Sequence, residues 1–444
     1  MALSGLEIYK HLPKTNCKEC GFPTCLAFAM QLAAKKVDLT KCPHITDAAK
    51  AALESASRPP IKLVTVGSGD EKLEIGNETV LFRHEETFYH PTGIALLIED
   101  TMPDAEVDEK ISKINKLSFE RVGQKIDVNL IALKYTKKDA FLALVKKAAA
   151  GSKLGLVLIC EDPAVAKEAA ALAKERTPLL YAATKDNAEE MAAVAKEQSL
   201  PLAVKADTLD GLAELVQKIT AKGVEDLILD STDKGLSKKI DDLTQIRRLA
   251  LKKTFRPMGY PTIAMTASTD PYQEVVEAAS YVAKYAGIVI MKGAEPWQVL
   301  PVLTVRQNIY TDPQKPLQVE AKIYEIGQVN DKSPVLVTTN FSLSYYSVES
   351  EVESSRVGAY IIASFAEGLS VLTAWAAEKF TAETIAKTLN ECGIKDKVSH
   401  KEVVIPGYVA VLSGQLEEES GWKVLVGPKE ASGIPSYLRT LKNA

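Results

Sequence analysis

The chain has 444 residues, of which 46% are hydrophobic and 25% charged, a composition typical of globular proteins. This length exceeds one ordinary core and predicts two or three domains, and the formal net charge of −4 argues against nucleic acid as the main partner. Neither a signal peptide nor an apolar run of membrane-spanning length is evident, so we expect a cytoplasmic protein that makes no membrane contact.

Four of the six cysteines lie near the N-terminus, at Cys17, Cys20, Cys25 and Cys42. The first three fall within nine residues around Gly21, where a tight turn can direct three sulfurs to one centre. An iron–sulfur cube takes four thiolates, so these cysteines are predicted to ligate a [4Fe–4S] cluster. Structural zinc, which usually takes two ligand pairs, and redox thiols are the alternatives. Disulfides fit less well because nothing else in the chain looks secreted.

Residues 1–58 are predicted to form a small helical domain that depends on its cluster for stability, because so short a chain buries little apolar surface. Residues 59–92 follow as a linker with short strands, and the two prolines at its start favour an extended chain. Helices are expected before Pro13, at Thr24–Lys36 and at Thr46–Ser57, and strands at Ile61–Val66 and Glu78–Arg83, as a hairpin that closes one end of the next domain.

From about Gly93 to Tyr310, eight short apolar runs alternate with amphipathic helices. The runs are continuous in Val, Ile, Leu and Ala, which is typical of parallel strands buried on both faces. Eight such units predict a TIM (β/α)8 barrel over residues 93–312, with a doubly wound open sheet as the alternative. The expected strands are Ile94–Ile98, Ile126–Leu133, Leu156–Cys160, Leu179–Ala183, Leu202–Lys205, Leu227–Asp230, Thr262–Met265 and Ile288–Met291.

A second proline-containing linker, Thr311–Pro316, precedes a smaller α/β domain over residues 317–444. Polar and glycine residues follow its strands, at the edge where open α/β sheets bind ligands. This pattern leaves a ligand crevice and ordinary turns equally open. The expected strands are Lys322–Ile326, Val335–Thr338, Tyr360–Ala363, Glu402–Ile405 and Lys423–Val426, with one long helix from about Ser370 to Leu389.

Several stretches resemble one known family. They are the four-cysteine pattern, LEIYKHLP at residues 6–13, TTNFSLSYY at 338–346 and GPKEASGIP at 427–435. Together they resemble the large (gamma) subunit of the corrinoid iron–sulfur protein of the acetyl-CoA (Wood–Ljungdahl) pathway, along essentially the whole chain. The resemblance implies an N-terminal [4Fe–4S] domain, a central TIM barrel and a C-terminal Rossmann-like corrinoid (cobalamin)-binding domain.

The resemblance also implies which residues contact the corrinoid. By motif position they are Thr338, Thr339, Asn340, Tyr346, Ser370, Val371, Leu372, Thr373, Gly407 and Gly433. Thr373 is expected beneath the cobalt. None of the five histidines stands in the Asp-x-His-x-x-Gly motif that supplies a lower cobalt ligand in other corrinoid domains. The family uses this base-off, His-off state, which should make cobalt easier to reduce to Co(I).

The implied function is that of a methyl carrier, with no catalytic side chain of its own. Its corrinoid Co(I) would accept methyl from methyltetrahydrofolate bound on a methyltransferase and pass it to acetyl-CoA synthase, while the [4Fe–4S] cluster reactivates inactive Co(II). The implied partners are the small subunit, as a heterodimer, the methyltransferase, CO dehydrogenase/acetyl-CoA synthase and a reductive activator. If assigned an enzyme class, the chain would be a methyltransferase component.

Two other functions compete with the methyl carrier. One is a stand-alone TIM-barrel oxidoreductase fed with electrons by the iron–sulfur domain, and the other is a structural subunit with a stabilising zinc. Charged residues end several predicted barrel strands, where such enzymes keep catalytic groups. They are Asp100, Lys205, Asp230 and Lys292. Given the resemblance, we favour a docking scaffold for the barrel.

Overall fold

The computed structural model describes residues 5–33, 36–37, 39–46, 49, 59–232, 235–314 and 316–443. The chain divides into two compact units, one made of Met1–Ser118 with Asp127–Tyr310 and the other of Phe119–Ile126 with Thr311–Ala444. Among the helices of these described residues, none is both long and apolar enough to cross a membrane.

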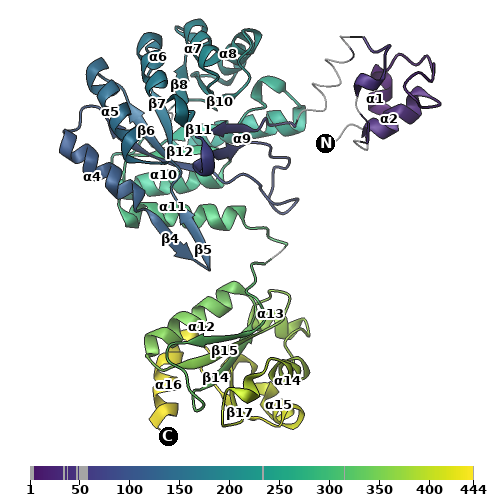
Figure 1. Ribbon diagram of the computed structural model, residues 1–444, viewed down its shortest axis with the longest axis vertical. Coiled ribbons are helices and arrows are strands. Elements are labelled where there is room, and N and C mark those ends of the chain that lie inside the picture. Colours follow the sequence, from purple (N-terminus) through teal and green to yellow (C-terminus); the bar gives the residue numbers. More distant parts are fainter. Residues whose placement is uncertain are drawn as a thin grey trace. The chain divides into compact units, whose positions relative to one another are not determined.

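The N-terminal region is helical (Figure 1). Helices α1 (Gly5–His11) and α2 (Cys25–Ala33) pack together, and a 3-10 turn spans Leu39–Lys41. Helix α1 ends two residues before Pro13, which cannot continue a helix hydrogen-bond ladder. The first two predicted helices are therefore confirmed. The third, Thr46–Ser57, lies almost entirely outside the described residues.

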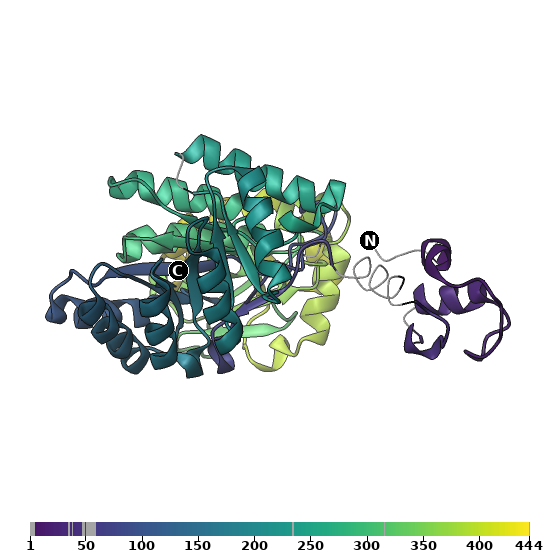
Figure 2. The same cartoon turned by 90° about the horizontal axis from the view of Figure 1, so that it is seen from above.

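Eight parallel strands form the predicted barrel, surrounded by helices in both views (Figures 1 and 2). They are β3 (Gly93–Glu99), β6 (Leu130–Lys134), β7 (Gly155–Ile159), β8 (Leu179–Ala183), β9 (Leu202–Lys205), β10 (Leu227–Asp230), β11 (Ile263–Met265) and β12 (Ile288–Met291). The helices are α4 (Asp104–Asn115), α5 (Lys138–Gly151), α6 (Pro163–Leu172), α7 (Ala188–Gln198), α8 (Leu209–Ala221), α9 (Leu236–Lys253), α10 (Pro271–Ala283) and α11 (Pro296–Tyr310). A parallel bridge from Leu229 to Thr262 joins the end strands β10 and β11 and closes the ring.

A short antiparallel hairpin, β1 (Val64–Val66) with β2 (Leu73–Ile75), contributes its apolar side chains to the barrel interior. The prediction of a hairpin here is thus confirmed, but the predicted position of its second strand was wrong. Glu78–Arg83 forms no strand, because Glu78 is buried and its carboxylate accepts the backbone N–H groups of Tyr89 and His90.

A second hairpin, β4 (Ser118–Arg121) with β5 (Gln124–Asp127), was not predicted. The sequence suggested one strand over Ile126–Leu133, whereas β5 ends at Asp127 and β6 begins at Leu130. Val122 and Gly123, which join β4 to β5, have φ of 54° and 67°. Two left-handed central residues are the signature of the commonest two-residue hairpin turn.

The C-terminal sheet has five strands in the order β13, β15, β14, β16, β17. They are β13 (Ile323–Ile326), β14 (Val335–Thr339), β15 (Ala359–Ser364), β16 (Glu402–Ile405) and β17 (Lys423–Val426), and only β13 runs antiparallel. Alternate side chains enter two cores. One core lies under α12 (Ser342–Ser355) and α16 (Ile434–Asn443), and the other lies under α14 (Ala382–Glu391) and α15 (Ser413–Ser420).

The predicted single helix over Ser370–Leu389 is wrong. The chain instead forms α13 (Val371–Ala376), breaks, and begins α14 at Ala382. The break has a local cause, since Glu378 is left-handed and Thr381 caps α14 in a capping box with Thr384. Phe380, fully buried, anchors the break in the core.

Candidate functional site

The N-terminal cysteines have the character of metal ligands. All four carry free thiols. Cys25 and Cys42 are buried at 7% and 6% exposure, and Cys20 packs against the same small apolar core. Cys25 is held to the preceding loop twice, because the Asn16 N–H points to its Sγ at 3.4 Å and its own N–H donates to Asn16 Oδ1 at 2.8 Å. Sheltered thiols with a backbone N–H on sulfur are what a cluster site requires.

The backbone around the first cysteines is also unusual. Lys14, Asn16 and Lys18 have φ of 60°, 51° and 68°, and Gly21 follows at 84°. Left-handed residues are a component of the backbone nests whose N–H groups bind anions and iron–sulfur clusters. A non-glycine residue in this region is uncommon, so three of them in five positions indicate a loop shaped for a ligand.

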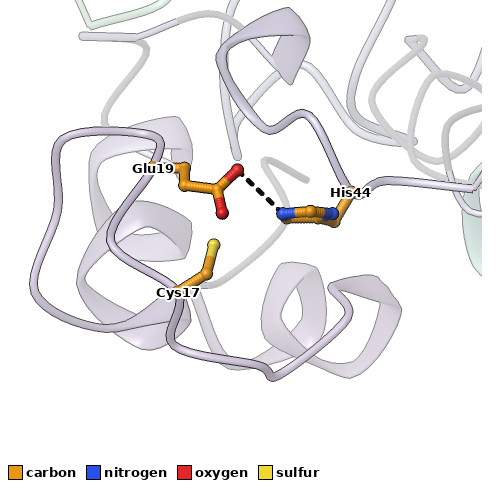
Figure 3. Close-up of side chains that lie close together, drawn as sticks. All are labelled: Cys17, Glu19 and His44. Carbon is orange, nitrogen blue, oxygen red and sulfur yellow. Dashed lines mark hydrogen bonds and ion pairs between the residues drawn. The ribbon is translucent and has the colours of Figure 1, made fainter.

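Cys17 lies beside two polar side chains, Glu19 and His44, as Figure 3 shows. Its Sγ, a Glu19 carboxylate oxygen and a His44 ring nitrogen all lie within 4.8 Å of one another. His44 Nε2 contacts Glu19 Oε2 at 2.9 Å. The partly exposed side of the cysteine site therefore carries a hydrogen-bonded pair, whereas the Cys25 and Cys42 side is apolar.

In the C-terminal unit, the topology itself defines a ligand crevice. The chain moves from β14 to β15 on one side and then returns to β16 on the other side of β14. Neighbouring strands β14 and β16 therefore send their following helices to opposite faces of the sheet, and their carboxyl ends flank a topological switch point. Ligands of open α/β sheets bind at such a point.

A pocket of about 300 Å³ occupies this switch point. Its walls are the ends of β14 and β16, the first turns of α12, and the loop after β17. The lining includes Leu336–Thr338, Leu343, Ser344, Ser347, Val348, Val371, Val404–Pro406, Tyr408, Gly427–Lys429, Ala431 and Ile434. Mostly apolar walls with a few hydroxyls suit a large organic ligand.

Two neighbouring hydroxyls at the end of β14 are buried and unpaired, and one of them belongs to the wall of this pocket. Thr338 and Thr339 are at most 1% exposed, yet their Oγ1 atoms find no hydrogen-bond partner among the described residues. Leaving such a group unpaired costs stability, so each orphan needs an explanation. Thr338 lines the pocket, and a polar atom of a bound ligand would satisfy its hydroxyl.

The other predicted corrinoid residues fall into three groups. Val371 lines the pocket, and its neighbours Ser370, Leu372 and Thr373 form the start of α13, where the Ser370 and Thr373 hydroxyls are 2.9 Å apart. Gly407 lies between two lining residues, and Gly433 precedes a third. Tyr346 lies elsewhere, in a more polar hollow with the tip of the β4–β5 hairpin.

The glycines of these loops serve loop packing. A Cβ on Gly407 would lie 2.6 Å from the carbonyl oxygen of Gly427, and one on Gly433 would lie 2.7 Å from a Pro428 side-chain carbon. These glycines therefore let the loops after β16 and β17 approach each other closely. The sequence predicted that the backbone at these glycines approaches a ligand closely. The structure shows that it approaches a neighbouring loop.

Sequence reasoning missed several residues of the pocket. Tyr408 is 45% exposed at the rim, and its hydroxyl donates to Glu430 at 2.6 Å, which raises the pKa of Tyr408. Ser344 and Ser347 reach the pocket from α12. For Tyr408 the available signal was its proximity to Gly407, and for Ser344 it was its place in the stretch 338–346. Ser347 follows that stretch directly and carried no signal of its own.

Exposed apolar side chains, which we call the apolar rim, lie on the elements that carry the lining residues Leu343, Val371 and Tyr408. Leu343, Leu372, Trp375, Tyr408 and Val411 are 41–73% exposed, and helix α13 contacts the 3-10 segment Gly407–Leu412. Large side chains gathered in this way indicate a surface that a ligand or partner covers.

His400 is the only histidine beyond residue 90. It lies just before β16, at the amino end of a strand whose carboxyl end borders the pocket. Its ring is engaged there, with Nε2 3.0 Å from the Ser333 carbonyl oxygen and Nδ1 accepting the Glu402 N–H at 3.2 Å. It is therefore unavailable as a ligand at the pocket.

Charged groups at the carboxyl ends of the barrel strands pair with one another. Glu99 and Lys134 lie 2.8 Å apart, Glu161 and Lys205 3.0 Å, and the buried Asp230 and Lys239 2.5 Å. The Asp100 carboxylate accepts two backbone N–H groups, and Lys292 Nζ donates to two carbonyl oxygens. The four candidate residues thus all make internal contacts that hold the strand ends together.

Comparisons with known proteins agree with these features. Residues 63–438 match the family described as CO dehydrogenase/acetyl-CoA synthase delta subunit, and residues 12–44 match a putative Fe-S cluster family. The chain is 51% identical to the corrinoid/iron-sulfur protein large subunit of Moorella thermoacetica, over 99% of both chains. The chain belongs to this family.

Archaeal members of the family are more distant. The acetyl-CoA decarbonylase/synthase complex subunit gamma of Methanothermobacter thermautotrophicus is 36% identical over 99% of both chains. Among solved structures, the 7,8-dihydropteroate synthase of Vibrio fischeri aligns with 56% of this chain and 99% of its own at 13% identity, with a TM-score of 0.39. Family membership therefore rests on the full-length relatives.

Proposed function

We propose that the chain is a methyl carrier that holds a corrinoid at the β14–β16 pocket and a [4Fe–4S] cluster on Cys17, Cys20, Cys25 and Cys42. The observation that carries this proposal is the pocket at the topological switch point with the unpaired hydroxyl of Thr338 in its wall. A corrinoid is larger than this pocket, so part of it would enter and the rest would lie over the rim.

The bound corrinoid would supply a reduced cobalt that accepts a methyl group from methyltetrahydrofolate and gives it to acetyl-CoA synthase. The chain's own contribution is binding and orientation. Thr338 and Val371 would contact the corrinoid in the pocket, with Ser370, Leu372 and Thr373 beside them on α13. The placement of His400 at the opposite edge of the sheet supports a cobalt without a histidine ligand.

The cluster would supply the electron that restores oxidised cobalt. Asn16 positions Cys25, while the apolar surroundings of Cys25 and Cys42 limit water at that side of the site. Water exclusion and N–H groups directed at sulfur are the means by which a protein adjusts a cluster potential.

The names of the relatives support specific partners. A large subunit implies a small subunit, and the family matched by residues 63–438 is described as a subunit of CO dehydrogenase/acetyl-CoA synthase. We propose that the small subunit covers the apolar rim, and that a methyltransferase and a reductive activator act on the same chain.

The test is methyl transfer. The chain, purified with its small subunit under anaerobic conditions and reduced, is incubated with the methyltransferase and radiolabelled methyltetrahydrofolate. We expect label to appear on the protein-bound corrinoid and to pass to acetyl-CoA when acetyl-CoA synthase, CO and CoA are added. Cobalt-loaded protein that takes up no label would overturn the proposal.

A further inference from the structure

Asn340 is placed differently from the other residues of the corrinoid motif. It is 2% exposed, and its side-chain amide is engaged on both sides. Its Oδ1 accepts the N–H groups of Ala366 and Gly368 at 2.9 and 3.1 Å, and its Nδ2 donates to Gln318 Oε1 at 2.9 Å. Asn340 therefore organises the turn after β15 from beneath.

Gln318 comes from the segment that follows the second linker. This segment pairs with the loop after β14, because Val319 N–H donates to the Asn340 carbonyl and Ser342 N–H donates to the Leu317 carbonyl, both at 2.9 Å. Gln318 itself is exposed, and within the described part of the chain its side chain hydrogen-bonds only to Asn340. The two backbone N–H donors require Asn340 Oδ1 toward the turn, and Gln318 Oε1 reinforces this orientation by accepting from Nδ2 on the other side.

The turn needs this support. Glu367 and Gly368 are both left-handed, with φ of 55° and 72°. A Cβ on Gly368 would lie 2.6 Å from Gln318 Cγ, so the Gln318 side chain also covers the turn from outside. One residue further on come Ser370 and the pocket-lining Val371, whose positions depend on where this turn ends.

We infer that Gln318 is a positioning residue for the corrinoid site. It holds the Asn340 amide on the side away from the turn, Asn340 holds the turn at residues 366–368, and the turn sets the start of α13 against the pocket. This inference rests on the proposed corrinoid function but concerns a residue outside the family motif stretches. Gln318 would touch no reacting atom.

Two substitutions separate the acceptor from the bulk of the side chain. Gln318→Leu keeps the volume and removes the acceptor, whereas Gln318→Glu keeps an acceptor for Asn340 Nδ2. The first readout is hydrogen exchange of the Ala366 and Gly368 amides in the corrinoid-free protein. We expect about fivefold faster exchange in Gln318→Leu, the factor that one net hydrogen bond is worth, and exchange within about twofold of wild type in Gln318→Glu.

The second readout is the rate of cobalamin release and the electron paramagnetic resonance signal of the reduced, Co(II)-loaded heterodimer. Gln318→Leu should release cobalamin several-fold faster with an altered signal, and Gln318→Glu should resemble wild type. Glu320→Gln is the matched control, because Glu320 lies two residues further along the same segment and its carboxylate pairs with Lys322. It should change neither readout.

The outcomes are distinct. Equal exchange in wild type and Gln318→Leu, or equal disturbance by both substitutions, would overturn the role of Gln318. If Gln318→Leu retains cobalamin as well as wild type, the role of Gln318 is also overturned, even when its amide hydrogen exchange is faster. If the wild-type heterodimer itself retains no cobalamin, the proposed function falls, and the role of Gln318 falls with it.

Discussion

At the scale of single residues, the Thr338 hydroxyl should affect stability and corrinoid binding in opposite directions. Its hydroxyl is buried and unpaired, so Thr338→Val should raise the free energy of unfolding of the corrinoid-free chain, by about 1 kcal/mol. The same change should weaken corrinoid binding roughly two- to tenfold, because the ligand loses its partner. Denaturant unfolding and cobalamin titration measure the two effects.

Thr388→Val is the control for that prediction. The Thr388 hydroxyl donates to the Thr384 carbonyl at 2.8 Å and lies 3.1 Å from Ser364 Oγ, and Thr388 does not line the pocket. It should lower the free energy of unfolding and leave corrinoid binding unchanged. A stabilised Thr338→Val protein with unaltered corrinoid affinity would show that the hydroxyl faces no ligand.

Cys25 should be required for iron. Its thiol is buried and held by Asn16, so Cys25→Ser should lose most of the bound iron of the wild-type chain. Cys392→Ser is the control, because it removes a thiol near the opposite end of the chain. This variant should retain as much bound iron as the wild-type chain. Iron analysis of the two anaerobically purified variants decides, and equal iron in both would contradict the assignment of Cys25.

Cys160 should behave in the opposite manner to a metal-binding thiol. Burial raises its pKa from 9.0 to about 11, so the thiol stays protonated and unreactive at pH 8 in the folded chain. Because the native state holds this proton more tightly than the unfolded state, its contribution to stability is complete below pH 9 and is lost between pH 9 and 11. Alkylation with mass spectrometry should find Cys160 protected at pH 8, and rapid labelling would contradict its burial.

At the level of elements, the break between α13 and α14 depends on a cap. The Thr381 hydroxyl accepts the Thr384 N–H at 3.2 Å, and the Thr384 hydroxyl accepts the Thr381 N–H at 2.8 Å. Thr381→Ala should lower the free energy of unfolding of the C-terminal unit by about 0.5–2 kcal/mol. Thr440→Ala, at an exposed position inside α16, is the control and should cost less; equal costs would refute the capping role.

The parallel strands were the most predictable elements. The apolar runs of the barrel strands are almost completely buried, and all eight barrel strands and the four parallel strands of the C-terminal sheet lie where the runs predict them, within a few residues. The antiparallel β13 was also predicted. The β4–β5 hairpin was not predicted, because β4 (Ser118–Arg121) alternates between exposed and half-buried residues and contains no apolar run. The helix break escaped because a capping box among threonines is a weaker signal than continuous helical periodicity.

The candidate site was predictable in part for the same reason. Parallel strands bring their carboxyl ends to one edge, so loops far apart in sequence could be assigned to one crevice. The Gln318–Asn340 pair was not predictable, because it joins residues 22 positions apart through side chains that no periodicity links. Tyr346 was assigned with the motif around it, but its position on α12 directs it to another hollow.

At the scale of the whole molecule, the proposed function requires two metal centres on one chain. The cysteine site lies in the N-terminal region, and the pocket lies in the C-terminal unit. The barrel between them in sequence has paired charges at its strand ends, in keeping with a scaffold.

The most direct measurement is the metal content of the chain, co-expressed with its small subunit in a corrinoid-producing host and purified without oxygen. The account predicts about four irons, as a [4Fe–4S] cluster requires, and one cobalt per heterodimer. A Co(I) absorption band should appear on strong reduction. Iron without cobalt, even after reconstitution with cobalamin, would contradict the methyl-carrier function, and zinc in place of iron would contradict the cluster.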